Sequence, residues 1–418
     1  MRFFSFLRVV MALALIPVVL GLFAGVAAAD EPKPTGSPVL SDPVFLAHRL
    51  DGTTAAGRIK QLGPQGTVVL VPPDGPEVTI PIRQLFKLTR ERFAPSTIVE
   101  GSLVLFPEGD RLRSVVGAAN ETALDVQSYA LGNLSIPLDH LLGLVLTPPP
   151  DADDLDALLN RIRTEPRSTE VLWLSNGDRL TGGFLGIDER KVKFQGETNP
   201  VELDRASVVA LAFDPSLVAY PRPEGDFLDL TLTDGSRLGV KMPKIERGHV
   251  VATTRFGVEV RLAIGELAAV HARTPSVEYL SDREASAKQY VTYLGPQRPY
   301  RRDATVDGHP FHLSGQVYDR GIGTQSRTLL AYRVSPGDRR FQATVGLDDH
   351  AGPLGSVVFR VLVDGKERFA SPPLSVRDQP RVIDVDLTGA KVLVLSTEFG
   401  ERGEVRDFAD WIEARLIR

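Results

Sequence analysis

The sequence contains no cysteine among its 418 residues. This absence excludes disulfide bonds, cysteine-ligated zinc or iron–sulfur sites, a thiol nucleophile and a lipid-modified N-terminal cysteine. The fold must therefore be held by the burial of apolar surface, and a chain of this length can bury enough of it.

Blocks of basic residues are also missing. The chain has 48 Lys and Arg against 53 Asp and Glu, which gives a formal charge of −5. Loss of Arg2 and Arg8 with a cleaved leader would make the chain more acidic still. A mildly acidic chain without basic blocks is not expected to bind nucleic acid.

Only one stretch is apolar enough to span a membrane, and it lies at the N-terminus. A basic start precedes an apolar run over residues 9–26 and three alanines at 27–29. This pattern predicts a signal peptide over residues 1–29, followed by a polar, proline-rich linker over 30–42. An uncleaved anchor is the alternative, because about 18 apolar residues approach the length of a bilayer span. We expect a secreted, periplasmic or cell-surface protein that contacts a membrane only if the leader stays attached.

Motifs of common enzymes are absent as well. The sequence has no G-x-S-x-G, H-E-x-x-H or Walker pattern. His309 and His312 stand in H-P-F-H, which suits a loop or a strand edge better than a zinc pair on a helix. Paired carboxylates for glycoside hydrolysis need only be close in space and stay open. The repeats described next leave no room for a barrel of about 250 residues, so we expect no enzymatic activity.

Glycine and proline are abundant instead, with 37 and 31 copies. Frequent turns between strand-like runs favour an all-β protein. Four alternating runs end in a similar tight turn: "VFLAHRLDGT", "SLVLFPEGDRL", "VLWLSNGDRL" and "LDLTLTDGSRL". Asn-Gly and Asp-Gly are strong hairpin signals, because glycine accepts a positive φ. The corresponding turn glycines are Gly52, Gly109, Gly177 and Gly235.

The same four segments also end alike. An apolar residue (Ile80, Ile136, Leu203 or Leu262) is followed in each by apolar residues five and eight positions later. Matching turns and tails indicate four repeats with a period of about 57 residues. We place repeats 1 and 2 at residues 43–149 and repeats 3 and 4 at 168–275. Their pattern is loosely similar to small SH3-like or Sm-like β-units that accompany binding modules in secreted bacterial proteins.

The segment between the two pairs of repeats, residues 150–167, has a different period. Its apolar residues fall at i, i+3, i+4 and i+7, with aspartates at its start and arginines at its end. This spacing predicts one short amphipathic helix that packs as a linker onto its neighbours.

From residue 276 the sequence pattern changes. Several runs in this region alternate apolar and polar residues, and they lie at 329–334, 340–349, 356–365, 381–389 and 391–400. These runs predict an antiparallel β-sandwich. The blocks "YLSD", "GQVYDRGIGTQS", "GSVVFRVLVDG", "VDLTGAKVLVLSTEFG" and "DFADWIEARL" resemble the NPCBM/NEW2 family of carbohydrate-binding modules over residues 276–418. The resemblance implies a galactose-binding-like sandwich of jelly-roll type that binds sugars and catalyses nothing. The full fold class is therefore all-β, with four small β-roll or barrel repeats followed by a jelly-roll β-sandwich.

The chain departs from the family pattern at three positions. Ile322 replaces a leucine, and Gln325 and Phe408 replace histidines. The loss of both histidines places in doubt any ligand contact that those side chains make in the family.

"YDRGIGTQS", residues 318–326, carries the strongest family marker. Its Gly-x-Gly is followed by "RTLLAYRV", a strand without a helix, which excludes a phosphate cradle at a helix N-terminus. We predict that Gly321 and Gly323 form a turn between strands.

Candidate sugar contacts are aromatic and hydrogen-bonding side chains in this region. Aromatic rings stack on sugars, but a buried Trp in a closing strand is an equally valid packing interpretation. Arg320 has the alternative of pairing with a carboxylate. The candidates are Tyr300, Tyr318, Arg320, Gln325 and Trp411.

Calcium is the one metal that the sequence suggests. Galactose-binding-like sandwiches often hold a structural calcium, and carboxylates at strand ends supply hard oxygen ligands. A solvated turn is the alternative for each residue. The candidate ligands are Asp348, Asp349, Asp407 and Asp410.

Together these patterns predict a secreted, non-catalytic protein whose C-terminal module recognises a glycan or polysaccharide. The first alternative is a structural or protein-interaction component of the cell envelope, with envelope proteins as partners, whose module has lost sugar binding. The second is a degenerate accessory chain of a glycoside hydrolase.

Overall fold

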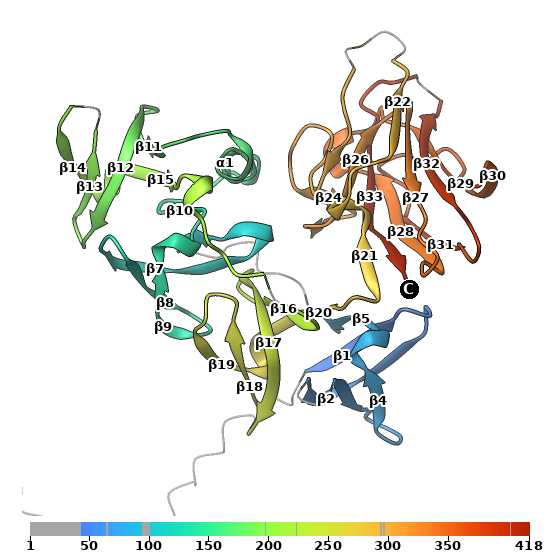
Figure 1. Ribbon diagram of the computed structural model, residues 1–418, viewed down its shortest axis with the longest axis horizontal. Coiled ribbons are helices and arrows are strands. Elements are labelled where there is room, and N and C mark those ends of the chain that lie inside the picture. The colour runs from blue at the N-terminus through green and yellow to red at the C-terminus, as the bar shows by residue number, and fades with distance from the viewer. Residues whose placement is uncertain are drawn as a thin grey trace, which may run out of the picture. The chain divides into compact units, whose positions relative to one another are not determined.

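A computed structural model describes residues 43–63, 66–93, 101–196, 198–222, 224–292, 295, 297–401 and 403–418. The signal peptide and linker predicted over 1–42 lie outside these residues. Over the described ranges the chain is all-β with one α-helix, α1 (Ala152–Thr164) (Figure 1). No helix in this part of the chain is long and apolar enough to cross a membrane.

The first unit of the chain is a five-stranded antiparallel sheet. Strand β1 pairs with β2, β2 with β3 and β3 with β4. A short 3-10 turn, η1 (Ile82–Gln84), then returns the chain so that the fifth strand pairs with the first. The strands are β1 (Val44–Arg49), β2 (Thr54–Leu62), β3 (Thr67–Val71), β4 (Val78–Pro81) and β5 (Leu85–Arg90).

The same order of pairing recurs in three more units. Unit 2 contains β6 (Ser102–Leu105), β7 (Arg111–Ala119), β8 (Ala123–Ser128), β9 (Gly132–Pro137) and β10 (Gly143–Val145). Unit 3 contains β11 (Glu170–Leu174), β12 (Arg179–Ile187), β13 (Lys191–Gln195), β14 (Pro200–Asp204) and β15 (Val208–Ala212). Unit 4 contains β16 (Phe227–Leu232), β17 (Arg237–Glu246), β18 (His249–Thr254), β19 (Glu259–Ala263) and β20 (Leu267–Arg273).

The recurring sequence features have distinct structural roles. The four turn glycines all have a positive φ, between 83° and 88°, a backbone region that other residues adopt at a cost. The apolar tail falls on the fifth strand of each unit, except that Leu141 of unit 2 lies just before β10. Both of its apolar positions are buried, as Leu85 and Leu88 are in unit 1 and Leu267 and Val270 in unit 4. The repeat signature therefore marks the first turn and the inward face of the last strand.

The fifth strands also join the units to one another. Strand β10 pairs with β15, which joins unit 2 to unit 3, and β5 pairs with β20, which joins unit 1 to unit 4. The pairing of β7 with β17, with Arg111 opposite Arg237, joins these two halves. All twenty strands thus form one continuous antiparallel sheet with a shared apolar core.

Helix α1 connects units 2 and 3. Asp151 caps its first turn by accepting hydrogen bonds from the backbone N–H groups of Asp153 and Asp154, which satisfies donors that the helix itself leaves free. The side chains of Leu159 and Ile162 are buried against residues of units 2 and 3.

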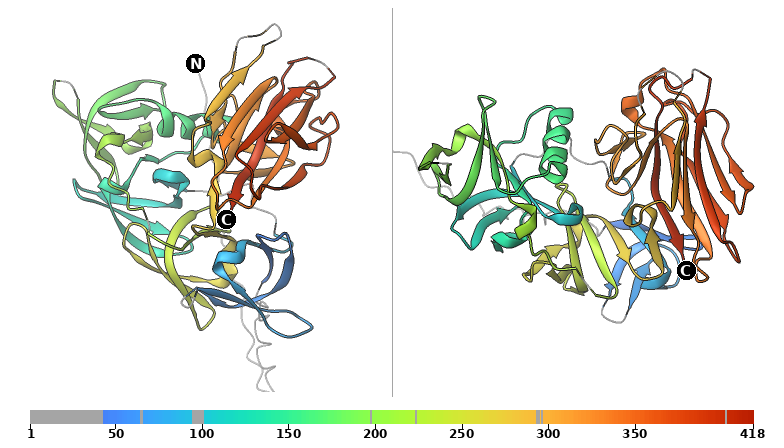
Figure 2. Two further views of the ribbon diagram at one scale, coloured as in Figure 1. Left: turned by 45° about the vertical axis from the view of Figure 1, so that its right-hand side comes forward. Right: turned by 45° about the horizontal axis from the view of Figure 1, so that its top comes forward.

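Residues 277–417 form a sandwich of two antiparallel sheets (Figures 1 and 2). One sheet has the order β23 (Arg301–Arg302), β26 (Gly321–Gln325), β33 (Phe408–Ile417), β28 (Arg340–Leu347) and β31 (Arg381–Asp386), with β21 (Val277–Tyr279) also on β33. The other has the order β22 (Ala287–Tyr290), β27 (Thr328–Arg333), β32 (Val392–Phe399), β29 (Val357–Val363) and β30 (Lys366–Ala370). A hairpin of β24 (Phe311–Leu313) and β25 (Gln316–Tyr318) lies beside them. The five strands predicted for this region are present within about three residues of their predicted ends.

The Gly-x-Gly pair does not form the turn that we predicted. Gly321 and Gly323 lie inside β26, paired with Ile412 and Asp410 of β33. A Cβ at Gly323 would meet the carbonyl oxygen of Ala304 at 2.4 Å, and one at Gly321 would meet that of Trp411 at 2.8 Å. Both glycines are therefore explained by close backbone approach within the sheet.

Candidate functional site

A cavity of about 570 Å³ adjoins the segment that links β25 to β26. This volume lies within the range of small-molecule sites. The sandwich contributes Tyr318, Asp319 and Arg320 to its lining, and the helix and the units contribute others, among them Asn160, Arg163, Glu108 and Tyr220. Two of the five sequence-predicted sugar contacts, Tyr318 and Arg320, therefore line the same cavity.

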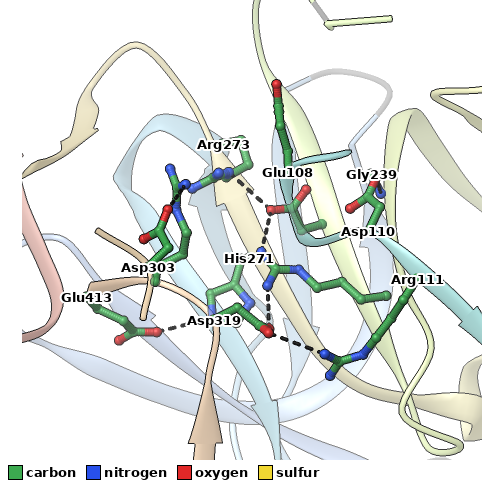
Figure 3. Close-up of polar contacts among 12 residues, drawn as sticks. Glu108, Asp110, Arg111, Gly239, His271, Arg273, Asp303, Asp319 and Glu413 are labelled. Carbon is green, nitrogen blue, oxygen red and sulfur yellow. Dashed lines mark hydrogen bonds and ion pairs between the residues drawn. The ribbon is translucent and has the colours of Figure 1, made fainter. Parts of the chain in front are cut away.

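Asp319 is the centre of an ionic network beside this cavity. Its carboxylate accepts hydrogen bonds from Arg237 and, at 3.3 Å, from Nη1 of Arg111 (Figure 3). Burial alone would raise the pKa of Asp319, but the cations Arg237, Arg111 and Arg163 outweigh it and hold the pKa well below its usual range. The carboxylate therefore stays ionised and ties the sandwich to strands β7 and β17.

The network continues away from the cavity through Asp229. This buried carboxylate lies 3.3 Å from Nη2 of Arg237 and 3.1 Å from Nε of Arg273. Arg237 is thus shared between two acids and is itself almost fully buried. Its Nη1 and Nη2 atoms each contact a carboxylate, and such paired contacts hold the guanidinium in a fixed geometry.

Arg320 is also held by acids. Its Nη1 donates to Oδ2 of Asp303 at 2.8 Å, its Nη2 donates to Asp282, and its guanidinium lies 4.9 Å from the ring centre of Tyr279. The pairing with a carboxylate, which the sequence left open, is therefore present.

Tyr318 presents a half-buried ring at the cavity. Its side chain packs on Phe311, Leu313 and Ile412, and its hydroxyl donates to Oε1 of Gln316 at 2.9 Å. Burial, with a smaller effect of Glu413, raises the pKa of Tyr318 to about 12. The phenol stays neutral and able to donate and accept hydrogen bonds.

Tyr300 and Gln325 do not line this cavity. The ring of Tyr300 packs against the sandwich core, and its hydroxyl accepts a hydrogen bond from the N–H of Ala285 at 3.2 Å. The side chain of Gln325 is half-buried, with its Oε1 buried and without a partner in the described part of the chain. The structure does not bring these two residues together with Tyr318 and Arg320.

Trp411 belongs to the sandwich core. Its side chain is 0 % exposed, it meets Phe359 edge-on at 5.2 Å, and its Nε1 donates to Oγ1 of Thr397 at 3.1 Å. A ring covered on every side has no free face for a sugar, so the packing interpretation replaces sugar stacking at this residue.

The acidic residues suggested for calcium form one cluster and one separate residue. Asp348 accepts N–H groups from His312 and His350, and Asp349 accepts those of Ser314 and Gly315. Asp410 is fully buried nearby, and burial together with the carboxylates of Asp348 and Asp349 raises its pKa well above the usual range.

Asp407 lies apart from this cluster. It accepts hydrogen bonds from the N–H of Ser356 and from the hydroxyl of Ser326, and burial raises its pKa to about 6.

These four acids do not fit a calcium site. Calcium takes six to eight oxygen ligands, whereas the oxygens of Asp348, Asp349 and Asp407 already accept hydrogen bonds from N–H and O–H donors. Among the described residues no group of three or more His, Asp or Glu is arranged to hold a metal ion.

A histidine cluster that the sequence did not reveal joins the sandwich to helix α1. Nε2 of His312 lies 3.0 Å from Oδ2 of Asp156, and Nε2 of His350 lies 3.2 Å from Oδ1 of Asp153. Nδ1 of His350 also contacts Asp348 at 2.7 Å. The H-P-F-H motif and the acidic start of the helix were visible in the sequence, but nothing in the sequence linked them.

Glu413 was not singled out either, because it looks like an ordinary polar position of the closing strand. Its carboxylate lies 2.9 Å from Nζ of Lys87. It also lies 3.4 Å from Nε2 of His271, a contact drawn in Figure 3. Burial alone would raise its pKa, but Lys87 and His271 outweigh this effect and lower it. This ion pair joins β33 to units 1 and 4.

Comparison with known proteins identifies the C-terminal part. The model of the NPCBM/NEW2 domain matches residues 276–417. The "Putative endo-alpha-N-acetylgalactosaminidase" of Renibacterium salmoninarum is 31% identical over 114 residues, which are 27% of this chain and 8% of that protein. The match therefore spans only a small part of the relative's length.

Solved structures with partial similarity include CBM51 from Clostridium perfringens GH95 in complex with methyl-galactose. It is 24% identical, and the alignment covers 34% of this chain and 99% of that one with a TM-score of 0.31. The tandem CBM51 modules of Sp3GH98 from Streptococcus pneumoniae SP3-BS71 are 13% identical, with 59% and 87% coverage and a TM-score of 0.30.

The family model covers the two sheets of the sandwich from β21 to β33, including the segment at the cavity. The resemblance noted in the sequence is thereby confirmed: residues 276–417 of this chain are an NPCBM/NEW2 domain.

Proposed function

We propose that the protein is an exported, non-catalytic glycan-binding protein whose NPCBM/NEW2 domain supplies the recognition surface. The observation that carries this proposal is the cavity whose wall is formed by Tyr318, Asp319 and Arg320 of that domain. The relative in R. salmoninarum is named for an enzyme that acts on N-acetylgalactosaminides, which makes a hexosamine-containing glycan a reasonable first ligand.

The cavity offers the chemistry that a sugar requires. Tyr318 presents an aromatic ring and a neutral hydroxyl, and Asn160 of helix α1 adds an amide with both donor and acceptor atoms. A pocket with an apolar surface and a few polar groups fixes the orientation of a small ligand. We expect the ring to stack on one sugar face while the amide binds hydroxyl groups.

The four units have a supporting role in this proposal. As small β-rolls they form a platform on which the sandwich is held, through Asp319 on units 2 and 4 and through Glu413 on units 1 and 4. Because units and helix α1 also line the cavity, we expect the full chain to bind differently from an isolated domain.

A structural role in the cell envelope is the second candidate. It is favoured by the ion pairs of Asp319 and Arg320, which use the polar groups of both side chains within the protein. In that case the NPCBM/NEW2 domain would serve to hold the units, and envelope proteins would be the partners.

A glycan array with the full chain separates the two candidates. We expect binding to a defined glycan that Tyr318→Ala weakens at least about ten-fold, the loss expected for one stacked aromatic ring. Tyr129→Ala, which removes a 62% exposed ring in unit 2, is the matched control and should bind like the parent. Absence of binding to every glycan, or equal loss in both variants, would refute the proposed site.

A further inference from the structure

The acids that line the cavity are each paired with a cation. Glu108 forms ion pairs with Nε of Arg222 at 3.0 Å and with Nη1 of Arg255 at 2.9 Å. Asp303 is paired with Arg320, and Asp319 with Arg111 and Arg237. No negative charge of the lining is left without a guanidinium in the described part of the chain.

Two cations of the lining are not matched in this way. Arg163 and Arg302 both line the cavity, and neither forms an ion pair with a described residue. The Nε and Nη2 atoms of Arg163 are buried and have no hydrogen-bond acceptor among the residues that the structure describes. Burial and then the cation Arg111 lower the pKa of Arg163, although Asp319 and Asp156 oppose this.

An unmatched guanidinium in a covered position is costly. A buried cation loses hydration, and the loss is recovered only when an anion with suitable geometry is present. Asp319 does not fill this role, because its two oxygens already accept from Arg237 and Arg111. The Nε and Nη2 donors of Arg163 therefore lack an acceptor in the described part of the chain, on a side chain that lines the cavity.

From this charge arrangement we infer that the cavity binds a glycan residue that carries a carboxylate, such as a uronic or sialic acid, with the carboxylate at Arg163. The planar fork of arginine donates two parallel hydrogen bonds to a carboxylate. The inference rests on the proposed function and names the class of sugar for the same site.

The helix places a second polar group beside this cation. Asn160 lies three residues before Arg163 and therefore on the same face of α1, and both line the cavity. Leu159 and Ile162 of the same turns are buried against units 2 and 3, which fixes the helix. Arg163 can thus bind a carboxylate while Asn160, on the same face of the helix, binds a neighbouring hydroxyl group.

The test measures binding of paired probes to the full chain by calorimetry. The acidic probes are sialyllactose and digalacturonic acid, and the neutral probes are lactose and N-acetylgalactosamine. We expect an acidic probe to bind at least about ten-fold more tightly than the neutral probes, the ratio typical of one charge-assisted hydrogen bond.

Variants assign the effect to Arg163. Arg163→Met keeps the aliphatic stem and should remove the preference for the acidic probe without lowering the thermal midpoint, because it removes an unpaired charge. Arg161→Met, on the same helix but with an exposed side chain next to Glu165, should keep the preference. If Arg163→Met lowers the thermal midpoint, Arg163→Lys is used as the test variant instead. Arg163→Lys should lose most of the preference for the acidic probe, because lysine lacks the planar guanidinium that donates two parallel hydrogen bonds.

The outcomes separate the two proposals. Equal binding of acidic and neutral probes, or equal losses in the Arg163 and Arg161 variants, would overturn the carboxylate inference and leave glycan binding intact. No binding to any probe would overturn the proposed function and the inference with it.

Discussion

Replacement of Asp319 by Asn tests whether the ionic network holds the sandwich to the repeat units. Asp319→Asn keeps the size of the side chain and removes its charge. Arg111 and Arg237 then lose a shared carboxylate, although Arg237 keeps Asp229 at 3.3 Å. The variant therefore isolates one charge in a network whose other members stay in place.

The expected loss of stability follows from the burial of the network. Removal of one partner from a fully buried ion pair costs about 3–5 kcal/mol, whereas exposed pairs contribute about 0–1 kcal/mol. The side chain of Asp319 is 24% exposed and that of Arg237 is 7% exposed. Because Arg237 keeps a second acid, we expect a loss of about 2–3 kcal/mol.

Urea unfolding followed by tryptophan fluorescence measures this loss. Trp173 lies in the core between helix α1 and units 2 and 3, and Trp411 lies in the sandwich core, so the two parts carry one probe each. We expect the transition that reports Trp411 to move to lower urea. Since the pKa of Asp319 is lowered in the folded protein, its contribution is present above the unfolded-state value of about 3.9 and lost as pH falls through the folded-state pKa. The difference between the parent and the variant should therefore vanish in strong acid.

The control is Asp204→Asn, which removes the 75% exposed partner of Lys191. This variant should unfold like the parent, because exposed pairs contribute little. If Asp319→Asn also unfolds like the parent at neutral pH, or if both variants lose the same stability, the network does not hold the two parts together.

Two further predictions concern the histidine cluster and β26. Asp156 raises the pKa of His312 against the opposing effect of burial. Burial also opposes the rise in the pKa of His350, which Asp348 and then Asp153 cause. The contribution of these contacts is complete below about pH 6.5 and is lost as pH rises through the folded-state pKa values. Hydrogen exchange of helix α1, corrected for intrinsic rates, should therefore increase with pH in the parent and increase less in Asp156→Asn, which keeps the contact of His350 with Asp153; a pH-independent parent would contradict this. Gly323→Ala should cost about 1–3 kcal/mol by overpacking, whereas Gly337→Ala, with nothing within 4 Å of the added Cβ, should be neutral in thermal unfolding; equal midpoints would exclude the close-approach explanation.

The histidine experiment depends on the charges around the cluster. His309 stacks on His350 at 5.9 Å, Arg406 donates to the carbonyl oxygen of His350, and Asp349 lies in the same loop. These groups are the same in the parent and in Asp156→Asn, so the comparison reports the contact with the helix.

Much of the fold could be predicted because it depends on sequence patterns within a few neighbouring residues. The turn glycine and the apolar tail of each unit are local requirements of a hairpin and of an inward strand face, and they recur at Gly52 and Leu85 as at Gly235 and Leu267. The pairing of β5 with β20 was not predictable, because any two of the four similar fifth strands could satisfy the same pattern.

The candidate site was predictable only in part, for a related reason. The family marker led to Tyr318 and Arg320, which do line one cavity. Asp319 finds its partners 82 and 208 residues away, and no local pattern specifies such a contact. The sequence could not decide whether Trp411 faces the core or the solvent, because a shift of one position in strand register moves a side chain from one face of the sheet to the other.

The pairing of the fifth strands has a consequence for biosynthesis. The inner pair, units 2 and 3, is nested within the outer pair, units 1 and 4, as in the stem of a nucleic-acid hairpin. Leu88 leaves the ribosome on the order of ten seconds or more before its partner Val270, at about 5–20 residues per second. Until then β5 presents an open strand edge, a template for wrong pairing. Nesting also means that a single repeat cannot be gained or lost without leaving one fifth strand unmatched, so this array is expected to change length only by pairs.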